Sequence, residues 1–385
     1  MKYVIKDGVC FVKVKGVLYD QEMENIVKFP NKKNIEVFEV PEEITGIDNS
    51  AFKKNKSLKK ISFSKNTKQI GKKAFKKCKK LKNIIIPEDV SVIGKSAFEK
   101  CIKLKRVEFE GPVEKLGNAV FSGCKALKDI KLPQGMKKVP PYLLSECSSL
   151  AEIELPETIK TIGDSAFATC VSLKQISFPE NLVEIGDLAF EDCSKLTQIN
   201  FNDKVEKLGN RSFKECSSLK SVEVPDNIKK IGVGAFEDCK HLVDIKLPNT
   251  LTEIDELVFH GCHDLENIEF PSSLTSINSF AFSSCRSLAQ LKLNENLKKI
   301  ESCAFIGCVS LANVEINEKL EEIGNSAFQY CTSLNEITIK SKKIKFGSLV
   351  FDSCEEIQKI NLYKDSEVEK YFIEKGFEDK ISYLE

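Results

Sequence analysis

The sequence contains no tryptophan, only three methionines and three histidines, and no long hydrophobic run. No stretch approaches the ~18 consecutive apolar residues of a membrane-spanning helix, and the first residues lack the apolar segment of a secretory signal. The 58 basic and 57 acidic residues leave a net charge of +1, which does not indicate a general polyanion binder. The sequence as written therefore predicts a chain without a transmembrane segment, and a cytoplasmic location is the direct expectation.

Residue patterns for catalysis and metal binding are also scarce. The histidines, His241, His260 and His263, fall in two adjacent segments beside cysteines that recur at a regular interval. Zinc accepts such ligands, but these cysteines are expected to point inward, so we expect no metal site. No serine or cysteine has a consistent histidine and acid partner, and the glycines form no phosphate loop. The sequence predicts neither an enzyme nor a cofactor, nor a small-molecule substrate.

A 23-residue repeat organises the chain. The pattern Ile-Gly-x-x-Ala-Phe-x-x-Cys recurs at 70–78, 93–101, 162–170, 185–193 and 323–331, with close variants between these segments. The Phe position holds Phe thirteen times and Leu at position 144, which makes fourteen units without insertion or deletion. A fixed period of about 20–29 residues containing Leu-x-x-Ile-x-Leu is the signature of a leucine-rich-repeat solenoid.

The pattern also predicts the local structure of each unit. In residues 150–156 the alternation predicts a short strand with Ile153 and Leu155 inside, which the proline ends. A second extended piece, 159–162, leads to Gly163, whose position also accepts Asp and Asn and predicts a corner with positive φ. Ala-Phe-x-x-Cys is predicted to form one helical turn. The predicted fold is an α/β, right-handed leucine-rich-repeat solenoid with one short parallel strand per coil on a concave sheet, and short extended and helical turns on the convex side.

Three regions follow from the register. Residues 1–34 do not fit the repeat, and their Asp-Gly and Lys-Gly pairs predict a β-hairpin cap. Residues 35–362 hold the array of fourteen units, and 363–385 are predicted to form a helix and a strand that cap the other end. Caps are expected because each end of a solenoid exposes core and strand edges.

Thirteen of the fifteen cysteines recur once per unit, from position 78 to position 354. Parallel side chains about 5 Å apart do not give the torsion of a disulfide, and Asn55 stands at the same place in an earlier unit. We therefore expect inward-facing thiols that bond backbone groups of the neighbouring coil, with a metal-thiolate or redox role as the alternative. Cys10 and Cys303 lie outside this ladder and are the candidates for reactive thiols. The core residues expected to hold the fold together include Phe75, Phe98, Phe167, Phe190, Phe236, Cys78, Cys101, Cys170, Cys193 and Cys239.

Outward-facing polar side chains of the predicted strands form stripes on the usual binding surface of a solenoid. The candidate binding residues on this face are Lys131, Glu152, Glu154, Gln175, Gln198, Asn200, Glu223, Asp244, Lys246, Asn267, Glu269, Lys292 and Glu315. The alternative is that the run from Lys246 to Glu315 is only a cross-strand charge ladder, which contributes about a few tenths of a kcal/mol per pair. The stripes contain no aromatic residue, although binding hot spots favour Trp, Tyr and Arg.

A second candidate surface is the span 53–82, which contains fourteen lysines and no Asp or Glu. The lysines singled out are Lys53, Lys54, Lys72, Lys73, Lys76, Lys77, Lys79 and Lys80. Such a patch predicts either contact with a polyanion, such as an acidic glycan, nucleic acid or anionic surface, or a solvated face. No aromatic residue is interleaved to stack on bases.

The unit Cys-x-x-Leu-x-x-Ile-x-Leu-Pro-x-x-Leu-x-x-Ile-Gly-x-x-Ala-Phe-x-x-Cys resembles the BspA-type (treponemal-type) leucine-rich repeat. Segments 16–19 and 365–371 are similar to the ends of such proteins. The resemblance implies a non-catalytic adhesion or protein-interaction module, often on a cell surface. We therefore expect a scaffold or adhesin that recognises a protein partner through its concave face. Attachment to an acidic polymer through 53–82 is the alternative function, and a cell-surface or secreted location is the alternative to the cytoplasm.

Overall fold

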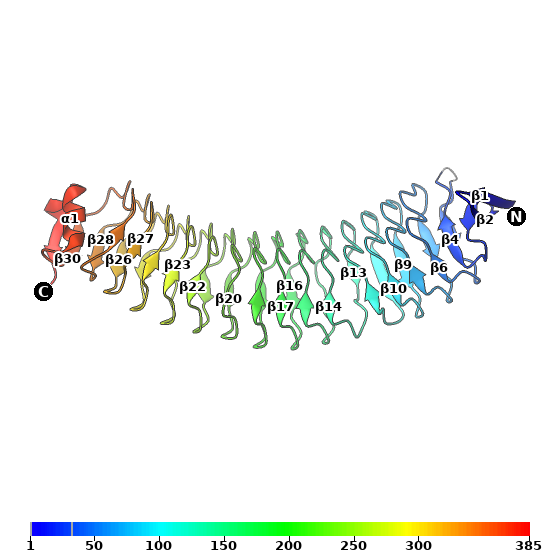
Figure 1. Ribbon diagram of the computed structural model, residues 1–385, viewed down its shortest axis with the longest axis horizontal. Coiled ribbons are helices and arrows are strands. Elements are labelled where there is room, and N and C mark those ends of the chain that lie inside the picture. The colour runs from blue at the N-terminus through cyan, green and yellow to red at the C-terminus, as the bar shows by residue number, and fades with distance from the viewer. Residues whose placement is uncertain (1, 32–33) are drawn as a thin grey trace. The chain divides into compact units, whose positions relative to one another are not determined.

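The computed structural model describes residues 2–31 and 34–385. It divides into two compact units, one of Met1–Leu182 with Ala189–Leu196 and the other of Val183–Leu188 with Thr197–Glu385. We call them unit 1 and unit 2. Within each unit the chain winds into successive coils, and equivalent strands of neighbouring coils lie side by side (Figure 1). The predicted solenoid of parallel strands is confirmed.

Most coils contribute two strands, because the second extended piece of the unit also pairs with its neighbours. We call the strands of the first piece the longer strands and those of the second piece the shorter strands, after their usual lengths. In unit 1 the longer strands are β5 (Val37–Glu39), β7 (Lys60–Ser62), β9 (Asn83–Ile86), β11 (Arg106–Phe109), β13 (Asp129–Ile130) and β16 (Gln175–Ser177). The shorter strands are β4 (Asn25–Lys28), β6 (Gly46–Ile47), β8 (Gln69–Ile70), β10 (Val92–Ile93), β12 (Lys115–Leu116), β14 (Lys138–Val139) and β15 (Thr161–Ile162). Ile93 pairs with Ile70 and Leu116, so the register is the 23-residue period of the sequence.

Unit 2 repeats this arrangement. Its longer strands are β18 (Gln198–Asn200), β20 (Ser221–Glu223), β21 (Asp244–Lys246), β24 (Gln290–Lys292), β26 (Asn313–Ile316), β28 (Glu336–Ile339) and β30 (Lys359–Leu362). Its shorter strands are β17 (Glu184–Ile185), β19 (Lys207–Leu208), β22 (Glu253–Ile254), β23 (Ser276–Ile277), β25 (Lys299–Ile300), β27 (Glu322–Ile323) and β29 (Lys345–Phe346). In both units most inward residues of these strands are buried Ile, Leu and Val.

The N-terminal cap consists of β1 (Lys2–Lys6), β2 (Val9–Val14) and β3 (Val17–Tyr19), which pair as consecutive antiparallel hairpins. β3 is antiparallel to β4, but β4 is parallel to β6, so the coils begin near residue 25 rather than after residue 34. Phe29 lies one period before Phe52 and stacks on it with ring centroids 4.5 Å apart. The predicted end of the cap therefore falls inside the first coil; residues 32–33 are outside the described part of the chain.

The C-terminal cap contains the predicted helix and strand. Helix α1 (Glu367–Glu374) begins at Ser366, whose side chain accepts a hydrogen bond from the Glu369 amide at 3.0 Å. A short 3₁₀ helix, η1 (Glu378–Lys380), leads to β31 (Ile381–Tyr383), which pairs in parallel with β30. Phe372 of α1 packs on Phe351 of the last coil with centroids 5.6 Å apart, so the helix covers the end of the core (Figure 1).

The interior of each coil is filled by the Phe of the repeat. In unit 1 the rings of Phe52, Phe75 and Phe98 stack with centroid distances of 4.6 and 5.1 Å. In unit 2 the same stack runs from Phe213 to Phe351 with distances of 5.2–5.9 Å. All five phenylalanines named from the sequence are fully buried. Each such ring contributes about 1.5–3 kcal/mol by burial alone, with the offset-stacked geometry adding to it.

The cysteine ladder lies beside this stack. The thiol of Cys101 donates to the carbonyl oxygen of Phe75 at 3.2 Å, and the thiol of Cys239 donates to that of Phe213 at the same distance. Burial raises the pKa of Cys170 to about 12, and it raises the pKa of Cys101 as well. All fifteen cysteines are free thiols, and the inward orientation and backbone bonding predicted for the ladder are confirmed.

The segment around each Phe is a series of turns, and the helical turn predicted for Ala-Phe-x-x-Cys is wrong. Two residues of each segment, two before and two after the Phe, have positive φ, as at Lys73 (59°) and Lys77 (63°) around Phe75. A right-handed helix needs negative φ throughout. The amides of Lys73, Phe75 and Lys77 instead donate to the next coil. The turn segments thus form a third ladder between coils.

The glycine at the corner serves close packing, and the positive φ predicted for it is wrong. At Gly94 a Cβ would lie 2.5 Å from the Lys72 amide nitrogen, and at Gly209 it would lie 2.4 Å from the carbonyl carbon of Gly186. Neither glycine has positive φ. The glycine is therefore required because neighbouring backbones touch at this corner.

Candidate functional site

The candidate residues of the strand face lie on or beside the longer strands, and all of them are exposed. Lys131, Glu152, Glu154 and Gln175 belong to unit 1, and Gln198, Asn200, Glu223, Asp244, Lys246, Asn267, Glu269, Lys292 and Glu315 belong to unit 2. Their neighbours Val222, Ile245 and Leu291 are buried, so inward and outward side chains alternate as the pattern predicts. We use the name strand face for this surface in each unit.

Ion pairs on the strand face are local and do not form the continuous charge ladder considered from the sequence. Lys246 pairs with Glu223 at 2.5 Å, and Glu315 pairs with Lys340 at 2.5 Å. Within the described residues, Glu269 and Lys292 have no ion-pair partner. Pairs this exposed contribute about 0–1 kcal/mol, so they do not explain the polar face as a stabilising device.

A cleft interrupts the strand face of unit 1. Residues 151–156 form no strand, so the ladder that ends at β13 leaves a gap before β16. The cleft at this gap has a volume of about 660 Å³ and is lined by Lys131, Glu152, Glu154 and Gln175 among others. These are four of the residues named from the sequence, and within the described chain none of the three charged ones has an ion-pair partner.

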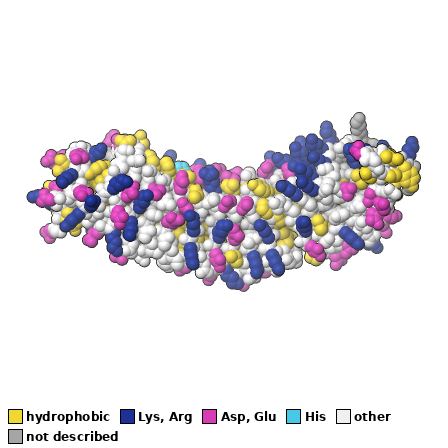
Figure 2. All heavy atoms as spheres, in the orientation of Figure 1, with side chains coloured by type: hydrophobic (Ala, Val, Ile, Leu, Met, Phe, Trp, Pro, Cys, Tyr) yellow, Lys and Arg dark blue, Asp and Glu magenta, His cyan; other side chains and the backbone are white. Residues whose placement is uncertain are grey.

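The lysine patch lies on the turn segments of unit 1. Figure 2 shows a dense gathering of basic side chains over the part of unit 1 that follows the N-terminal strands. Lys54, Lys72, Lys79 and Lys80 are exposed, and Lys53, Lys73, Lys76 and Lys77 are half-buried. The neighbouring ammonium groups of Lys72 and Lys76 lower the pKa of Lys73, which reports a concentrated positive potential. All eight lysines named from the sequence are at least partly exposed and belong to the turn segments of two neighbouring coils.

The patch extends beyond the span recognised in the sequence. Lys54, Lys77 and Lys100 occupy the same place in three consecutive coils, and their amides donate to the next coil, which fixes their spacing. One acidic residue of this region, Glu99, pairs with Lys76 at 2.6 Å. Lys100 was not singled out because the run without acids ends before it, although the 23-residue period placed it in line.

The two ladder cysteines beside the histidines bond main-chain groups, since the thiol of Cys239 donates to the Phe213 carbonyl and that of Cys262 to the Phe236 carbonyl. The Nδ1 atom of His241 lies 2.8 Å from an Asp264 carboxylate oxygen at the surface. Burial and the nearby Arg286 lower the pKa of His263. Within residues 2–31 and 34–385, no group of three or more His, Cys, Asp or Glu side chains has the arrangement of a metal site.

The two cysteines outside the ladder are partly exposed. Cys10 lies in β2 opposite Ile5 of β1. Cys303 occupies a turn position with a φ of 58°, and burial raises the pKa of its thiol. A raised pKa lowers the thiolate fraction at neutral pH, so the reactivity predicted for Cys303 is reduced, whereas Cys10 stays a candidate.

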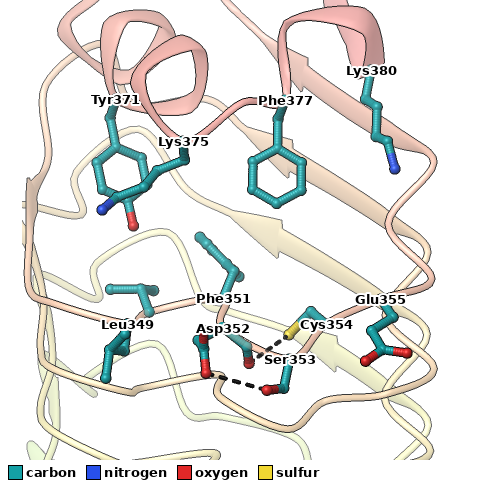
Figure 3. A pocket seen from close by; sticks show the side chains of 11 residues that line it. Leu349, Phe351, Asp352, Ser353, Cys354, Glu355, Tyr371, Lys375, Phe377 and Lys380 are labelled. Atoms are coloured by element: carbon teal, nitrogen blue, oxygen red, sulfur yellow. Dashed lines mark hydrogen bonds between the residues drawn. The ribbon is translucent and has the colours of Figure 1, made fainter.

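Sequence reasoning missed a cleft at the end of unit 2. It has a volume of about 480 Å³ and lies between the turn segment of the last coil and the C-terminal cap. Figure 3 shows Tyr371, Lys375 and Phe377 on the cap side, facing Leu349 and Asp352 of the coil. The cap itself was predicted, but the pattern gives no signal of the space that the cap leaves uncovered.

Comparison with known proteins places this arrangement in a family. The sequence model of the BspA type leucine rich repeat region matches residues 26–151, 137–266 and 252–376. The chain belongs to the BspA-type leucine-rich repeat family. The match begins at residue 26, inside β4, which agrees with the start of the coils in the structure. A comparison with curated proteins gives no match.

Two crystal structures of bacterial leucine-rich repeat proteins are similar in fold. A leucine-rich repeat protein from Bacteroides ovatus is 24% identical with a TM-score of 0.72, over 100% of this chain and 98% of that one. A leucine rich cell surface protein from Faecalibacterium prausnitzii is 24% identical with a TM-score of 0.53, over 88% of this chain and 94% of that one. Across the described residues, no helix has the length and apolar character required to cross a membrane.

Proposed function

We propose that this BspA-type repeat protein is a non-catalytic scaffold or adhesin that binds a protein partner through its strand face. The observation that carries the proposal is the cleft of unit 1, where Lys131, Glu152 and Glu154 have no ion-pair partner in the described chain. Charges without internal partners add little to stability, whereas charges at the rim of an interface steer association and fix its register.

The cleft also supports the proposal by its composition. Buried Ile130 and Ile153 form its floor, while Glu152, Glu154 and Gln175 stand around it. A partner surface with a small apolar projection and basic groups beside it fits this arrangement. The coil that carries the cleft is held by its turn segment, where the Glu146 amide donates to the Ala168 carbonyl at 2.7 Å, and a surface held in place before binding loses little conformational entropy.

We propose the cell surface as the site of action, with the cytoplasm as the alternative. The similar protein from F. prausnitzii is described as a cell surface protein. Surface biotinylation with cell fractionation of the native organism tests this location. Labelling of intact cells supports the adhesin, and recovery in the cytosol alone directs the search to intracellular protein partners.

Site-specific photo-crosslinking in the native organism tests the binding face. A photoreactive amino acid at Gln175, in the cleft, is expected to capture a defined protein. The same group at Glu114, an exposed residue beside the short strand β12, is the control and is expected not to capture it. The double variant Glu152→Lys with Glu154→Lys, combined with the Gln175 probe, is expected to abolish capture. Equal capture from Gln175 and Glu114, or capture that survives the charge reversal, would overturn the proposal.

A second candidate function is attachment to an acidic polysaccharide through the lysine patch. The lowered pKa of Lys73, which lies between Lys72 and Lys76, favours this function. It reflects repulsion among the ammonium groups, and a bound anion would relieve that repulsion. Lysines without exposed aromatic side chains suit sulfate or carboxylate groups better than stacked bases.

Heparin chromatography tests this second function. Replacement of Lys72, Lys77, Lys79 and Lys80 by Glu is expected to abolish retention, and the wild-type affinity should fall steeply with salt. The matched control replaces four exposed lysines elsewhere in unit 1, Lys125, Lys137, Lys138 and Lys160, with the same change of net charge. Equal loss in both variants indicates a general charge effect, and stronger retention on DNA than on heparin at equal salt indicates nucleic acid instead.

A further inference from the structure

The turn segments of neighbouring coils are joined by a regular set of hydrogen bonds. In most coils the amides two residues before the Phe, at the Phe, and two residues after it donate to carbonyl groups of the following coil. Near the end of unit 2, Ser326 donates to Ser348 at 2.8 Å, Phe328 to Val350 at 3.0 Å and Tyr330 to Asp352 at 3.0 Å. Every turn segment therefore needs an acceptor segment on its C-terminal side.

The last turn segment has no such acceptor. The equivalent amides are those of Leu349, Phe351 and Ser353, and none of them has a hydrogen-bond partner among residues 2–31 and 34–385. The C-terminal cap covers two other parts of this coil, since β31 pairs with β30 and Phe372 covers the Phe351 ring. No segment of the cap takes the place of the next turn.

The three unpaired amides belong to residues that line the 480 Å³ cleft. On the opposite wall, Tyr371, Lys375 and Phe377 of the cap face Leu349 and its neighbours across the opening (Figure 3). Leu349 is 52% exposed, although it is a large apolar residue. The cleft thus combines a row of main-chain donors with apolar side chains on both walls.

We propose that this cleft binds a peptide segment of a partner protein that takes the conformation of a repeat turn, and whose main-chain carbonyl groups accept from Leu349, Phe351 and Ser353. The segment adds to the coil ladder in the place of the missing turn, and its affinity comes from main-chain hydrogen bonds, as it does when a peptide joins an open sheet edge. The site belongs to unit 2 and differs from the strand face, so it goes beyond the function proposed above.

A peptide fits the cleft better than a small anion. The donors lie on alternate residues along the chain, and the carbonyl groups that accept from the equivalent amides one coil earlier also lie on alternate residues, Ser348, Val350 and Asp352. The donors do not belong to consecutive residues as in an anion-binding nest. The charges of the lining balance, with Lys375 and Lys380 against Asp352 and Glu355. Lys380 is already engaged, because its ammonium donates to the Ile357 carbonyl at 2.6 Å.

The structure also specifies the side chain at the centre of the peptide. The central residue of the peptide stands at the position that a further coil would fill with the Phe of the repeat. The ring of Phe372 already occupies that position against Phe351. We therefore expect a small residue there. Apolar side chains near it can contact Leu349 and Phe377.

Selection from a displayed library of random twelve-residue peptides tests the proposal, with full-length wild-type protein as bait. The blocking variant is Leu349→Asp, which places a carboxylate beside the donors at a φ of 58°, a conformation that Asp tolerates. Leu257→Asp is the matched control, since Leu257 has a φ of 61° but its amide donates to Ser279 at 3.2 Å. Enriched peptides are expected to bind wild type and the control alike, and the blocking variant at least about ten-fold more weakly, which corresponds to about 1.4 kcal/mol.

Amide hydrogen exchange provides the second readout. An enriched peptide should slow exchange at Leu349, Phe351 and Ser353, while the paired amides of Ser326 and Phe328 exchange slowly with or without peptide. Phe377→Ala should weaken binding, and Ile373→Ala, an exposed residue of α1 outside the cleft, should not. Failure to enrich peptides, equal binding by the Leu349→Asp variant, or unchanged exchange overturns the proposal. Slowed exchange with inorganic phosphate but with no peptide overturns it in favour of an anion site.

Discussion

The thiol of Cys170 donates a hydrogen bond to the carbonyl oxygen of Leu144, with 3.3 Å between the sulfur and the oxygen. Leu144 is the residue that replaces Phe in the repeat, and Cys170 bonds it as the other ladder thiols bond a Phe carbonyl. The ladder therefore depends on the backbone of the preceding coil and tolerates a change of its side chain. Burial raises the pKa of Cys170 to about 12 from an ordinary value of 9.0.

The first prediction concerns pH and the Cys170→Ala variant. The pKa of the Cys170 thiol is higher in the folded chain than in the unfolded chain, so between these two values only the unfolded chain loses the proton. The contribution of Cys170 to the free energy of unfolding is therefore full below pH 9 and is lost as pH rises toward 12. The wild type should be more stable than Cys170→Ala at pH 8 by about 1–3 kcal/mol. This difference in the free energy of unfolding should shrink by about 2 kcal/mol at a pH about 1.5 units above the ordinary pKa of a cysteine thiol. Urea unfolding of both proteins at the two pH values measures it, and a difference independent of pH contradicts the assignment.

The second prediction concerns the stacked rings. Phe75 lies between Phe52 and Phe98, 4.6 and 5.1 Å away, and it is fully buried. Phe75→Ala should lower the free energy of unfolding by about 3–5 kcal/mol. Phe75→Leu, which copies the residue at position 144, should cost less than Phe75→Ala because it leaves a smaller cavity. Denaturant unfolding compares the two; similar losses would mean that the stack, and not its volume, is what the coil requires.

The third prediction separates close packing from backbone conformation at glycine. Gly94→Ala places a Cβ 2.5 Å from the Lys72 nitrogen and should destabilise by about 1–3 kcal/mol or more through overpacking. Gly135 has a φ of +80° and no atom within 4 Å of its Cβ position, so Gly135→Ala should cost about 1–2 kcal/mol from the left-handed conformation alone. Gly94→Asn, which helps only where φ is positive, should be no better than Gly94→Ala. Thermal melts of the three variants measure these losses. A higher melting temperature for Gly94→Asn than for Gly94→Ala would support the positive φ that the sequence predicted at this corner.

The sequence was most informative where one residue type recurs for one physical reason. Phe75 and Cys101 represent two positions of the repeat that recur every 23 residues and are buried. A row of large apolar groups and neutral thiols is accommodated only in the interior. The role of Gly94 could not be predicted, because a glycine required by positive φ and one required by backbone contact look the same in a sequence. Lys77 shows the other half of this error: its side chain gives no hint of its φ of 63°.

The candidate sites were predictable only in part. The alternation around Glu152 and Glu154 placed these side chains outside, and they are exposed. The cleft beside them depends on the loss of strand pairing at residues 151–156, where the repeat pattern is intact. The open amides of Leu349 and Phe351 depend on what the cap leaves uncovered, which is a relation between segments and not a property of either sequence.

The last prediction uses the positive φ values as a source of stability. Thr169 has a φ of 61°, a conformation that is unfavourable for a β-branched residue, and its amide donates to the Glu191 carbonyl at 2.6 Å. Thr169→Gly removes the steric cost of about 1–2 kcal/mol and adds about 0.5–1 kcal/mol of backbone entropy cost, so the variant should be more stable by about 0.5–1 kcal/mol. Thr252→Gly, at an exposed position without positive φ, should lose about 0.5–1 kcal/mol instead. Urea unfolding at neutral pH measures both, and a loss at Thr169 would mean that the side chain, through contacts on the surface of the coil, holds its own backbone in the left-handed conformation.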